Sequence, residues 1–229
     1  MEVKIAGLQK MTLLDYPGKV ACTVFLAGCD LRCPFCHNAG LLDASAPAAM
    51  EVGDLLRFLE QRRGLLDGVA ITGGEPLLRD LKPLLTEIRS LGYPVKLDTN
   101  GTHPEALGEL LELGLADYVA MDVKNSPERY ARTVGLEHFD LGPVRESIAL
   151  LLGGKTDCEF RTTAVAELHD DASFHGIGAM IRGAKRHFLQ PFQDRDTVPF
   201  AGLHAPAPAD LGRWREIMAG YVTRAEIRG

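Results

Sequence analysis

The sequence predicts an α/β fold in which six parallel strands form an incomplete barrel. Short apolar runs alternate along the chain with segments whose apolar residues recur at helical spacing. Such alternation is typical of parallel sheets with right-handed crossovers. The strand–helix unit recurs six times, whereas a closed barrel of this type has eight units. We therefore expect a barrel that stays open.

Six apolar runs are the expected strands: Val20–Ala27, Val69–Thr72, Val95–Thr99, Tyr118–Val123, Glu159–Val165 and His187–Phe192. The first run is uninterrupted, as expected for a strand that is buried on both faces. Helices are expected between the strands and after the last one, because apolar residues there follow the helical period. Their apolar faces contain Val52, Leu55, Leu56 and Leu59; Leu81, Leu84, Leu85 and Ile88; Val144, Ile148 and Leu151; and Leu211, Trp214, Met218 and Tyr221. Two more helices are expected, one after Thr102-His103-Pro104-Glu105 and one over 172–184.

We expect a single domain over residues 1–229. A leader at 1–19 ends in the turn sequence Asp15-Tyr16-Pro17-Gly18. The barrel core is expected at 20–193, with a Pro/Ala-rich connection at 44–50, and a linker and C-terminal helix follow at 194–229.

The amino-acid composition argues against several classes of protein. The formal net charge is −6 and the chain has no dense run of Lys and Arg, so a nucleic-acid partner is not expected. No apolar run is long enough to cross a membrane, and the first residues do not resemble a signal peptide. Five cysteines without export argue against a disulfide framework. We therefore expect a cytoplasmic protein in which Cys22 and Cys158 are small buried apolar residues.

Cysteines are concentrated at Cys29–Cys36, which reads Cys-Asp-Leu-Arg-Cys-Pro-Phe-Cys. Three thiols so close together suit a soft metal or an iron–sulfur cluster, and three ligands leave one position of a tetrahedral site open. Cys33-Pro34-Phe35-Cys36-His37 also spells a haem-attachment pattern, and Cys33 with Cys36 spells a redox dithiol. A structural zinc site is a further alternative. Spacing alone leaves a cluster, zinc and redox use open.

Polar residues also follow the other expected strands, at the ends where ligands bind in parallel α/β folds. The segments are Gly73-Gly74-Glu75-Pro76, Asp98-Thr99-Asn100-Gly101, Asp122-Val123-Lys124, Arg161-Thr162-Thr163 and Gln190-Pro191-Phe192-Gln193. Each segment alone could be a turn or a local ion pair. Their recurrence at one end of every strand predicts a shared pocket.

The cysteine spacing, with Phe35 before the last cysteine, resembles the cluster motif of the radical S-adenosylmethionine (SAM) superfamily. The resemblance implies a partial barrel in which Cys29, Cys33 and Cys36 hold a [4Fe-4S] cluster and the fourth iron binds SAM. It also implies that Gly73-Gly74-Glu75-Pro76 holds the amino group of the methionine part of SAM.

Four further segments are similar to motifs of glycyl-radical-enzyme activating proteins: Asp15–Gly18, Cys36-His37-Asn38, Asp98–Gly101 and Asp122-x-Lys124. The opening from Leu13 to Asn38 is most similar to activating proteins of anaerobic ribonucleoside-triphosphate reductase, in their longer form. This resemblance implies reductive cleavage of SAM, with flavodoxin or ferredoxin as electron donor. The resulting 5′-deoxyadenosyl radical would take hydrogen from a glycine of the partner glycyl radical enzyme.

The resemblance also implies roles for single residues. Asp98, Thr99 and Asp122 would hold a monovalent cation beside the SAM carboxylate. Lys124 and Arg161 would line the pocket for the nucleotide and methionine, and Asp15 would lie near the incoming glycine. The remaining residues of the expected SAM site are Phe35, Asn100 and Gln193.

Differences from the formate-lyase type of activating protein leave the identity of the partner enzyme undecided. That type has glycine where this chain has Tyr16 and histidine where it has Gln193, and it can carry extra cysteines that 37–68 lacks. The alternatives are an activator of another glycyl radical enzyme, a radical SAM enzyme that acts on a small molecule, as in modified-base biosynthesis, and a non-enzymatic zinc or redox module.

Overall fold

The computed structural model describes residues 3–45 and 47–229. The first two residues of the expected leader, and Ala46 of the expected connection, lie outside this range. The chain forms two compact units. The first contains the chain up to Asp30, Gly40–Thr99 and Glu105–Val119. The second contains Leu31–Ala39, Asn100–Pro104 and Ala120–Gly229. The single domain expected over the whole chain stays a prediction.

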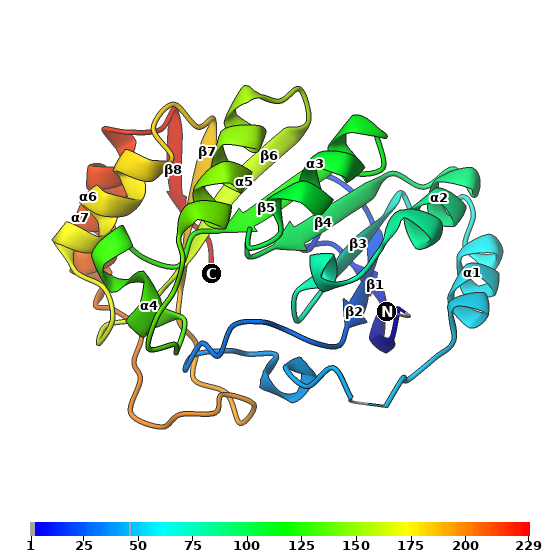
Figure 1. Ribbon diagram of the computed structural model, residues 1–229, viewed down its shortest axis with the longest axis horizontal. Coiled ribbons are helices and arrows are strands. Elements are labelled where there is room, and N and C mark those ends of the chain that lie inside the picture. Colours follow the sequence, from blue (N-terminus) through cyan, green and yellow to red (C-terminus); the bar gives the residue numbers. More distant parts are fainter. Residues whose placement is uncertain (1–2, 46) are drawn as a thin grey trace. The chain divides into compact units, whose positions relative to one another are not determined.

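Strands of the first unit follow one another in sequence order: β1 (Ile5–Thr12), β2 (Ala21–Leu26), β3 (Gly68–Gly73) and β4 (Val95–Thr99) (Figure 1). β1 is antiparallel to β2, and β2, β3 and β4 are parallel. The register pairs Leu26 with Gly73. The loops that leave β2 and β3 therefore start at the same edge of the sheet, where the cysteine stretch and the Gly-Gly-Glu-Pro segment begin.

Helices of the first unit have the apolar faces that the sequence predicts. They are α1 (Val52–Gln61), α2 (Lys82–Ser90) and α3 (Pro104–Glu112), with short 3-10 turns η1 (Ala39–Leu41) and η2 (Pro76–Leu78). Leu55 and Leu59 of α1 are buried, and so are Leu84, Leu85 and Ile88 of α2. The helical spacing of these leucines therefore marks the core face correctly.

The second unit contains the end of β5 (Tyr118–Asp122), then β6 (Asp157–Ala164), β7 (Arg186–Pro191) and β8 (Arg224–Ile227). β6, β7 and β8 are parallel neighbours (Figure 1). Its helices are η3 (Pro127–Arg129), α4 (Tyr130–Thr133), α5 (Gly142–Gly153), α6 (Asp171–Met180) and α7 (Pro208–Ala219). α6 and α7 pack together, and the rings of Phe174 and Trp214 stack between them with centroids 4.7 Å apart.

All six expected strands are confirmed, with ends that differ by two residues or fewer. Two strands were not expected: β1 lies inside the leader, and β8 follows the C-terminal helix. Buried and exposed residues do not alternate regularly in β1, and residues near its end are exposed. β8 is short and carries charged residues, so neither strand gives an apolar run. Within 3–45 and 47–229, no helix is long and apolar enough to cross a membrane.

Candidate functional site

Cys29 lies in the first unit, directly after β2, in a loop whose backbone is tied to a second loop. Gly28 N donates to Leu41 O at 2.7 Å, and Cys29 N donates to Leu42 O at 3.2 Å. Gly28 has a φ of +100°, a backbone conformation that residues other than glycine rarely adopt. Main-chain hydrogen bonds thus hold the loop that carries Cys29.

Cys33 and Cys36 lie in the second unit, on a single turn. Cys36 N donates to Cys33 O at 3.1 Å, and Arg32 N donates to Val134 O at 2.9 Å. Phe35, between the two cysteines, is only 3% exposed. Burial raises the pKa of Cys33 to about 11 and also raises the pKa of Cys36.

A redox dithiol would use Cys33 and Cys36 and leave Cys29 without a role, whereas a cluster uses all three cysteines. Metal ligands lose their protons when the metal binds, so the donor set of three thiols fits an iron–sulfur cluster. All five cysteines are free of disulfides. In the described part of the chain, no three His, Cys, Asp or Glu side chains are already gathered as a metal-binding group.

The two glycines after β3 allow backbone to approach backbone. Gly74 N donates to Leu26 O at 2.9 Å and Glu75 N to Gly28 O at 2.7 Å. A Cβ at Gly73 would lie 2.3 Å from Leu26 O, and one at Gly74 would lie 2.0 Å from Gly28 O. No side chain fits at either position, so packing of the two loops requires both glycines, and the role of the segment in binding SAM stays a prediction.

The carboxylate of Glu75 is buried, and hydrogen bonds fix its orientation. The residue is 1% exposed, and its Oε1 accepts hydrogen bonds from Leu77 N at 3.0 Å and from Thr99 Oγ1 at 2.8 Å. Pro76 follows it as the first residue of η2. A carboxylate held in this way is suited to a charge-assisted hydrogen bond with an ammonium group.

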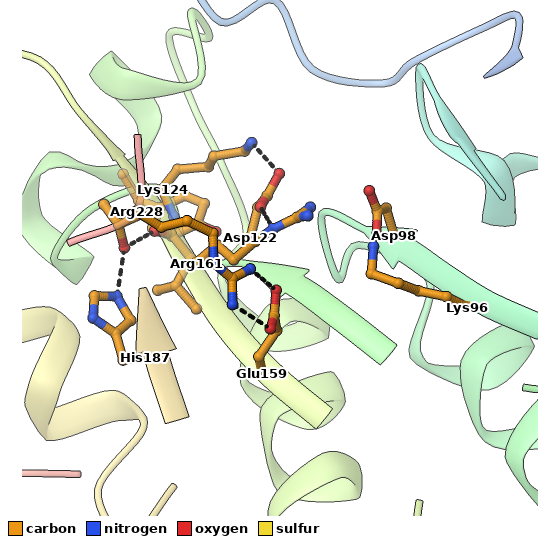
Figure 2. A network of polar contacts seen from close by, with 11 residues as sticks. Lys96, Asp98, Asp122, Lys124, Glu159, Arg161, His187 and Arg228 are labelled. Atoms are coloured by element: carbon orange, nitrogen blue, oxygen red, sulfur yellow. Dashed lines mark hydrogen bonds and ion pairs between the residues drawn. The ribbon is translucent and has the colours of Figure 1, made fainter. Parts of the chain in front are cut away.

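Asp98 forms an ion pair with Lys96, a residue that sequence reasoning missed. The two residues alternate on β4, so their side chains lie on one face of the strand (Figure 2). Lys96 is buried, and a buried lysine almost always has a partner. The spacing of two residues along a predicted strand was the signal that could have found it.

Asp122, Lys124 and Arg161 form a charged cluster in the second unit (Figure 2). Lys124 Nζ donates to Asp122 Oδ2 and Arg161 Nε donates to Asp122 Oδ1, both at 2.9 Å. Burial opposes the charge of each group, yet the two cations hold the pKa of Asp122 below its usual range. Burial likewise opposes the charge of Lys124, but Asp122 raises the pKa of Lys124. All three side chains therefore stay charged.

A buried histidine, which sequence reasoning also missed, forms hydrogen bonds with the backbone next to this cluster. Val165 N donates to His169 Nδ1 at 3.1 Å, so His169 Nε2 carries the proton and donates to Lys124 O at 2.9 Å. Burial lowers the pKa of His169, which favours this neutral form. The loops that follow β5 and β6 are thereby joined through one imidazole.

Asn100 and Gly101 form a packed turn. Asn100 Oδ1 accepts hydrogen bonds from Thr102 N at 2.9 Å and Thr102 Oγ1 at 2.6 Å. Gly101 has φ of +79°, and a Cβ there would lie 2.0 Å from Met121 Cε. These contacts give the Asn-Gly pair a structural role, and its part in the SAM site stays a prediction.

Asp15 and Gln193 have local partners. Asp15 Oδ2 accepts a hydrogen bond from Thr23 Oγ1 at 2.5 Å, within the first unit. The Gln193 side chain is exposed and accepts from Arg195 Nη2 at 2.7 Å, within the second unit. His37 Nε2 donates to the main-chain oxygen of Gln193 at 2.7 Å. Thus the backbone of Gln193, rather than its side chain, is tied to the segment that contains Cys36.

Comparisons with known proteins identify the family of the chain. The family model of the Radical SAM superfamily matches residues 23–164. A protein of Methanocaldococcus jannaschii, provisionally named a glycyl-radical enzyme activating enzyme, is 30% identical over 238 residues, which cover 100% of this chain and 97% of that protein. The pyruvate formate-lyase-activating enzyme of Clostridium pasteurianum is 30% identical over 128 residues, 53% of this chain and 52% of that enzyme. The 7-carboxy-7-deazaguanine synthase of Hyperthermus butylicus is 42% identical over 93 residues, 39% of this chain and 38% of that enzyme.

Two solved structures show the same fold. Streptococcus suis SuiB bound to precursor peptide SuiA has a TM-score of 0.66 and 17% identity, covering 88% of this chain and 46% of that chain. A domain of a pyruvate-formate lyase-activating enzyme from Bacteroides vulgatus has a TM-score of 0.58 and 17% identity, covering 71% of this chain and 99% of that chain. At such low identity the likeness concerns the fold alone.

The chain therefore belongs to the radical SAM superfamily, whose partial α/β barrel is the fold that the sequence predicted. It is an enzyme of this superfamily, and membership implies SAM and a [4Fe-4S] cluster as cofactors. Within the superfamily it belongs to the glycyl-radical-enzyme activating enzymes, because it is similar along its whole length to the Methanocaldococcus jannaschii protein.

Proposed function

We propose that the chain takes a hydrogen atom from a glycine Cα of an anaerobic ribonucleoside-triphosphate reductase, and so activates that enzyme. The observation that carries the activating role is the match over the whole chain to an activating enzyme. A cluster held by Cys29, Cys33 and Cys36 would supply, once reduced, the electron for cleavage of the S–C5′ bond of SAM, which would yield methionine and the 5′-deoxyadenosyl radical that takes the hydrogen. A flavodoxin or ferredoxin is the proposed donor, because a sulfonium requires an electron of low potential.

In this proposal the residues of the first unit hold the methionine end of SAM. Gly73 and Gly74 let the segment pack closely against the main chain of Leu26 and Gly28, which holds Glu75 in place. Glu75 accepts a hydrogen bond from the SAM ammonium group, and Thr99 and Leu77 fix the orientation of its carboxylate. Cys29 supplies one of the three thiolates for the cluster.

Residues of the second unit supply the other thiolates and the cationic groups. Cys33 and Cys36 act from their shared turn, and Phe35 shields them from water. Lys124 and Arg161 present two cations, both oriented by Asp122, to the carboxylate and nucleotide of SAM. Their fixed geometry would limit how far SAM can move when its bond breaks.

The region around Asp15 supports a protein substrate. Leu13 and Leu14 precede Asp15 and are 69% and 86% exposed, and adjacent exposed apolar side chains are typical of a surface that meets another protein. Tyr16, which replaces the glycine of the formate-lyase type, is buried, and its ring contacts that of Tyr118 at a centroid distance of 6.1 Å. Together with the opening from Leu13 to Asn38, this difference supports the reductase as partner.

Electron paramagnetic resonance tests the proposal. The chain is reconstituted and reduced without oxygen, then mixed with SAM and a candidate anaerobic ribonucleoside-triphosphate reductase. We expect a glycyl radical signal that is lost in Cys29→Ala, Cys33→Ala and Cys36→Ala and kept in the control Cys158→Ala. Cleavage of SAM without a glycyl radical on any candidate partner would show that the activating role is wrong.

A second candidate is a reaction on a small molecule, because 7-carboxy-7-deazaguanine synthase is similar to 39% of this chain. That similarity is local, whereas the match to the activating enzyme extends over the chain. A labelled hydrogen transferred from a small molecule to 5′-deoxyadenosine, with no partner protein present, would favour this candidate.

A further inference from the structure

Lys96 lies beside a carboxylate that was expected to bind a monovalent cation. Its ammonium group forms an ion pair with Asp98, and Figure 2 shows the two side chains directed toward one another. The Lys96 side chain is 2% exposed and that of Asp98 is 18% exposed. Burying a lysine is costly unless a carboxylate compensates its charge. The pair is therefore a fixed part of the strand rather than a surface contact.

The strand geometry explains why Lys96 reaches Asp98. The two residues are two positions apart on β4, so both side chains leave the same face of the sheet. On the neighbouring strand β3, the residue paired with Lys96 is Ala70. A residue as small as alanine leaves room for the long lysine side chain to extend along the sheet toward Asp98.

Asp122, the other carboxylate expected to bind the cation, also has cationic partners, all within the second unit. Arg161 Nε donates to its Oδ1 and Lys124 Nζ donates to its Oδ2, both at 2.9 Å. Each oxygen of Asp122 thus already faces a positive charge. In its own unit, each of the two expected carboxylate ligands is neutralised by side chains of this chain.

A cation site built from oxygen ligands depends on carboxylate charge that is not already balanced. Asp98 with Lys96 carries no net charge, and Asp122 with Lys124 and Arg161 is net positive. The expected set of Asp98, Thr99 and Asp122 does not fit a bound sodium or potassium ion. We infer that Lys96 supplies, from within the chain, the positive charge that a monovalent cation would place beside Asp98, so that SAM binds without Na⁺ or K⁺.

Lys96 acts in this inference as a positioning residue, through Asp98. The inference rests on the proposed function only in placing Asp98 near the SAM carboxylate. Binding of sodium to the protein can be measured without SAM or a partner enzyme, so a wrong partner would leave that measurement intact.

Sodium NMR relaxation is the first measurement, on the reconstituted protein in choline buffer with added Na⁺. We expect wild type and Lys96→Arg to show no saturable relaxation that K⁺ can displace. Lys96→Met, which keeps the approximate length of the side chain and removes its charge, should gain such a signal because the positive charge of Lys96 beside Asp98 is then lost. A saturable signal displaced by K⁺ in wild type would overturn the inference, even if Lys96→Met failed to fold.

SAM affinity is the second measurement, in choline, Na⁺ and K⁺ at matched ionic strength. Wild type should bind SAM equally, within about twofold, in all three, since screening is the same. Lys96→Met should bind about tenfold more weakly in choline, the order expected for losing one charge-assisted interaction, and K⁺ should restore most of the loss. Wild-type affinity of Lys96→Met in choline would also overturn the inference. A loss that K⁺ does not repair would do the same, since it would mean that Lys96 only supports the fold.

Discussion

Arg228 donates two parallel hydrogen bonds to Glu159, from Nη1 to Oε1 at 2.8 Å and from Nη2 to Oε2 at 3.1 Å (Figure 2). Glu159 is 1% exposed, and the Arg228 guanidinium lies 3.4 Å from the centroid of the Phe188 ring. The short strand β8 is in this way fastened at its end to β6, across β7.

Replacing Arg228 by methionine should lower the free energy of unfolding by about 2–3 kcal/mol, because the charge of Glu159 loses a two-point partner. Urea unfolding measures the loss. The matched control is Arg224→Met on the same strand, whose pair with Glu226 is exposed to solvent and should contribute much less to stability. Equal losses for the two variants would contradict the prediction. The double variant Glu159→Leu, Arg228→Met should be more stable than Arg228→Met alone.

His187 should make the protein less stable in acid. Thr162 Oγ1 donates to Val123 O at 2.8 Å, so His187 Nε2 carries the proton and donates to Thr162 Oγ1 at 3.0 Å. Among the described residues, Nδ1 has no hydrogen-bond partner. Burial lowers the pKa of His187 from 6.5 to about 3. The imidazole is therefore neutral in the folded chain, although the unfolded chain binds a proton below pH 6.5.

The stability that depends on neutral His187 is complete above pH 6.5 and falls as the pH drops from 6.5 toward 3. The slope attributable to this residue approaches about 1.4 kcal/mol per pH unit. We expect His187→Gln to flatten the curve of unfolding free energy against pH over this interval, whatever its effect at neutral pH. His138→Gln, at an exposed position, is the control and should leave the curve unchanged. Parallel curves for His187→Gln and wild type would show that another group governs the acid response.

Glu75→Gln should weaken SAM binding more than it weakens the fold. Glutamine keeps an oxygen that can accept from Leu77 and Thr99, but it removes the charge that would attract the SAM ammonium group. A charged hydrogen bond contributes about 1.5–3 kcal/mol, so SAM affinity should fall by about tenfold to a hundredfold. Calorimetric titration with SAM measures this change. Glu109→Gln, in an exposed pair with Lys82, should bind SAM as wild type does; a similar loss there would refute the assignment.

Gly74→Ala should disrupt the segment after β3. Its Cβ would lie 2.0 Å from Gly28 O and 3.2 Å from Leu41 O, and main-chain atoms cannot move away as a flexible side chain can. We expect a loss of about 3 kcal/mol or more in unfolding free energy, together with loss of SAM binding. Gly40→Ala is the control, because nothing lies within 4 Å of the added methyl group. A stable Gly74→Ala protein would mean that the loops after β2 and β3 can separate without cost.

The sequence predicted elements whose signal is local. β2 and β3 are almost fully buried, so each gives an apolar run, and α2 presents Leu84, Leu85 and Ile88 at helical spacing. β8 could not be found in this way, because its four residues, Arg-Ala-Glu-Ile, have partly exposed side chains and depend on Arg228 reaching Glu159, 69 residues away in the sequence.

The site residues likewise fall into those that a local sequence motif predicts and those that only the folded structure shows. The cysteine spacing and the Gly-Gly-Glu-Pro segment are contiguous motifs, and they identified the superfamily. Lys96 was missed because one lysine within a strand has no motif, although its burial and its pair with Asp98 define its role. His169 was missed because its two partners, Val165 N and Lys124 O, are main-chain atoms that a sequence does not distinguish.

β8 is the last strand in the order, so one of its sides has no neighbouring strand among the described residues. Exposed strand edges of this kind invite pairing with other molecules, which leads to aggregation. Arg224 and Glu226 form an exposed ion pair on this strand, which is also only four residues long. Charge and shortness together discourage a second molecule from adding a strand there, so this edge of the sheet can stay unpaired without becoming a template for self-association.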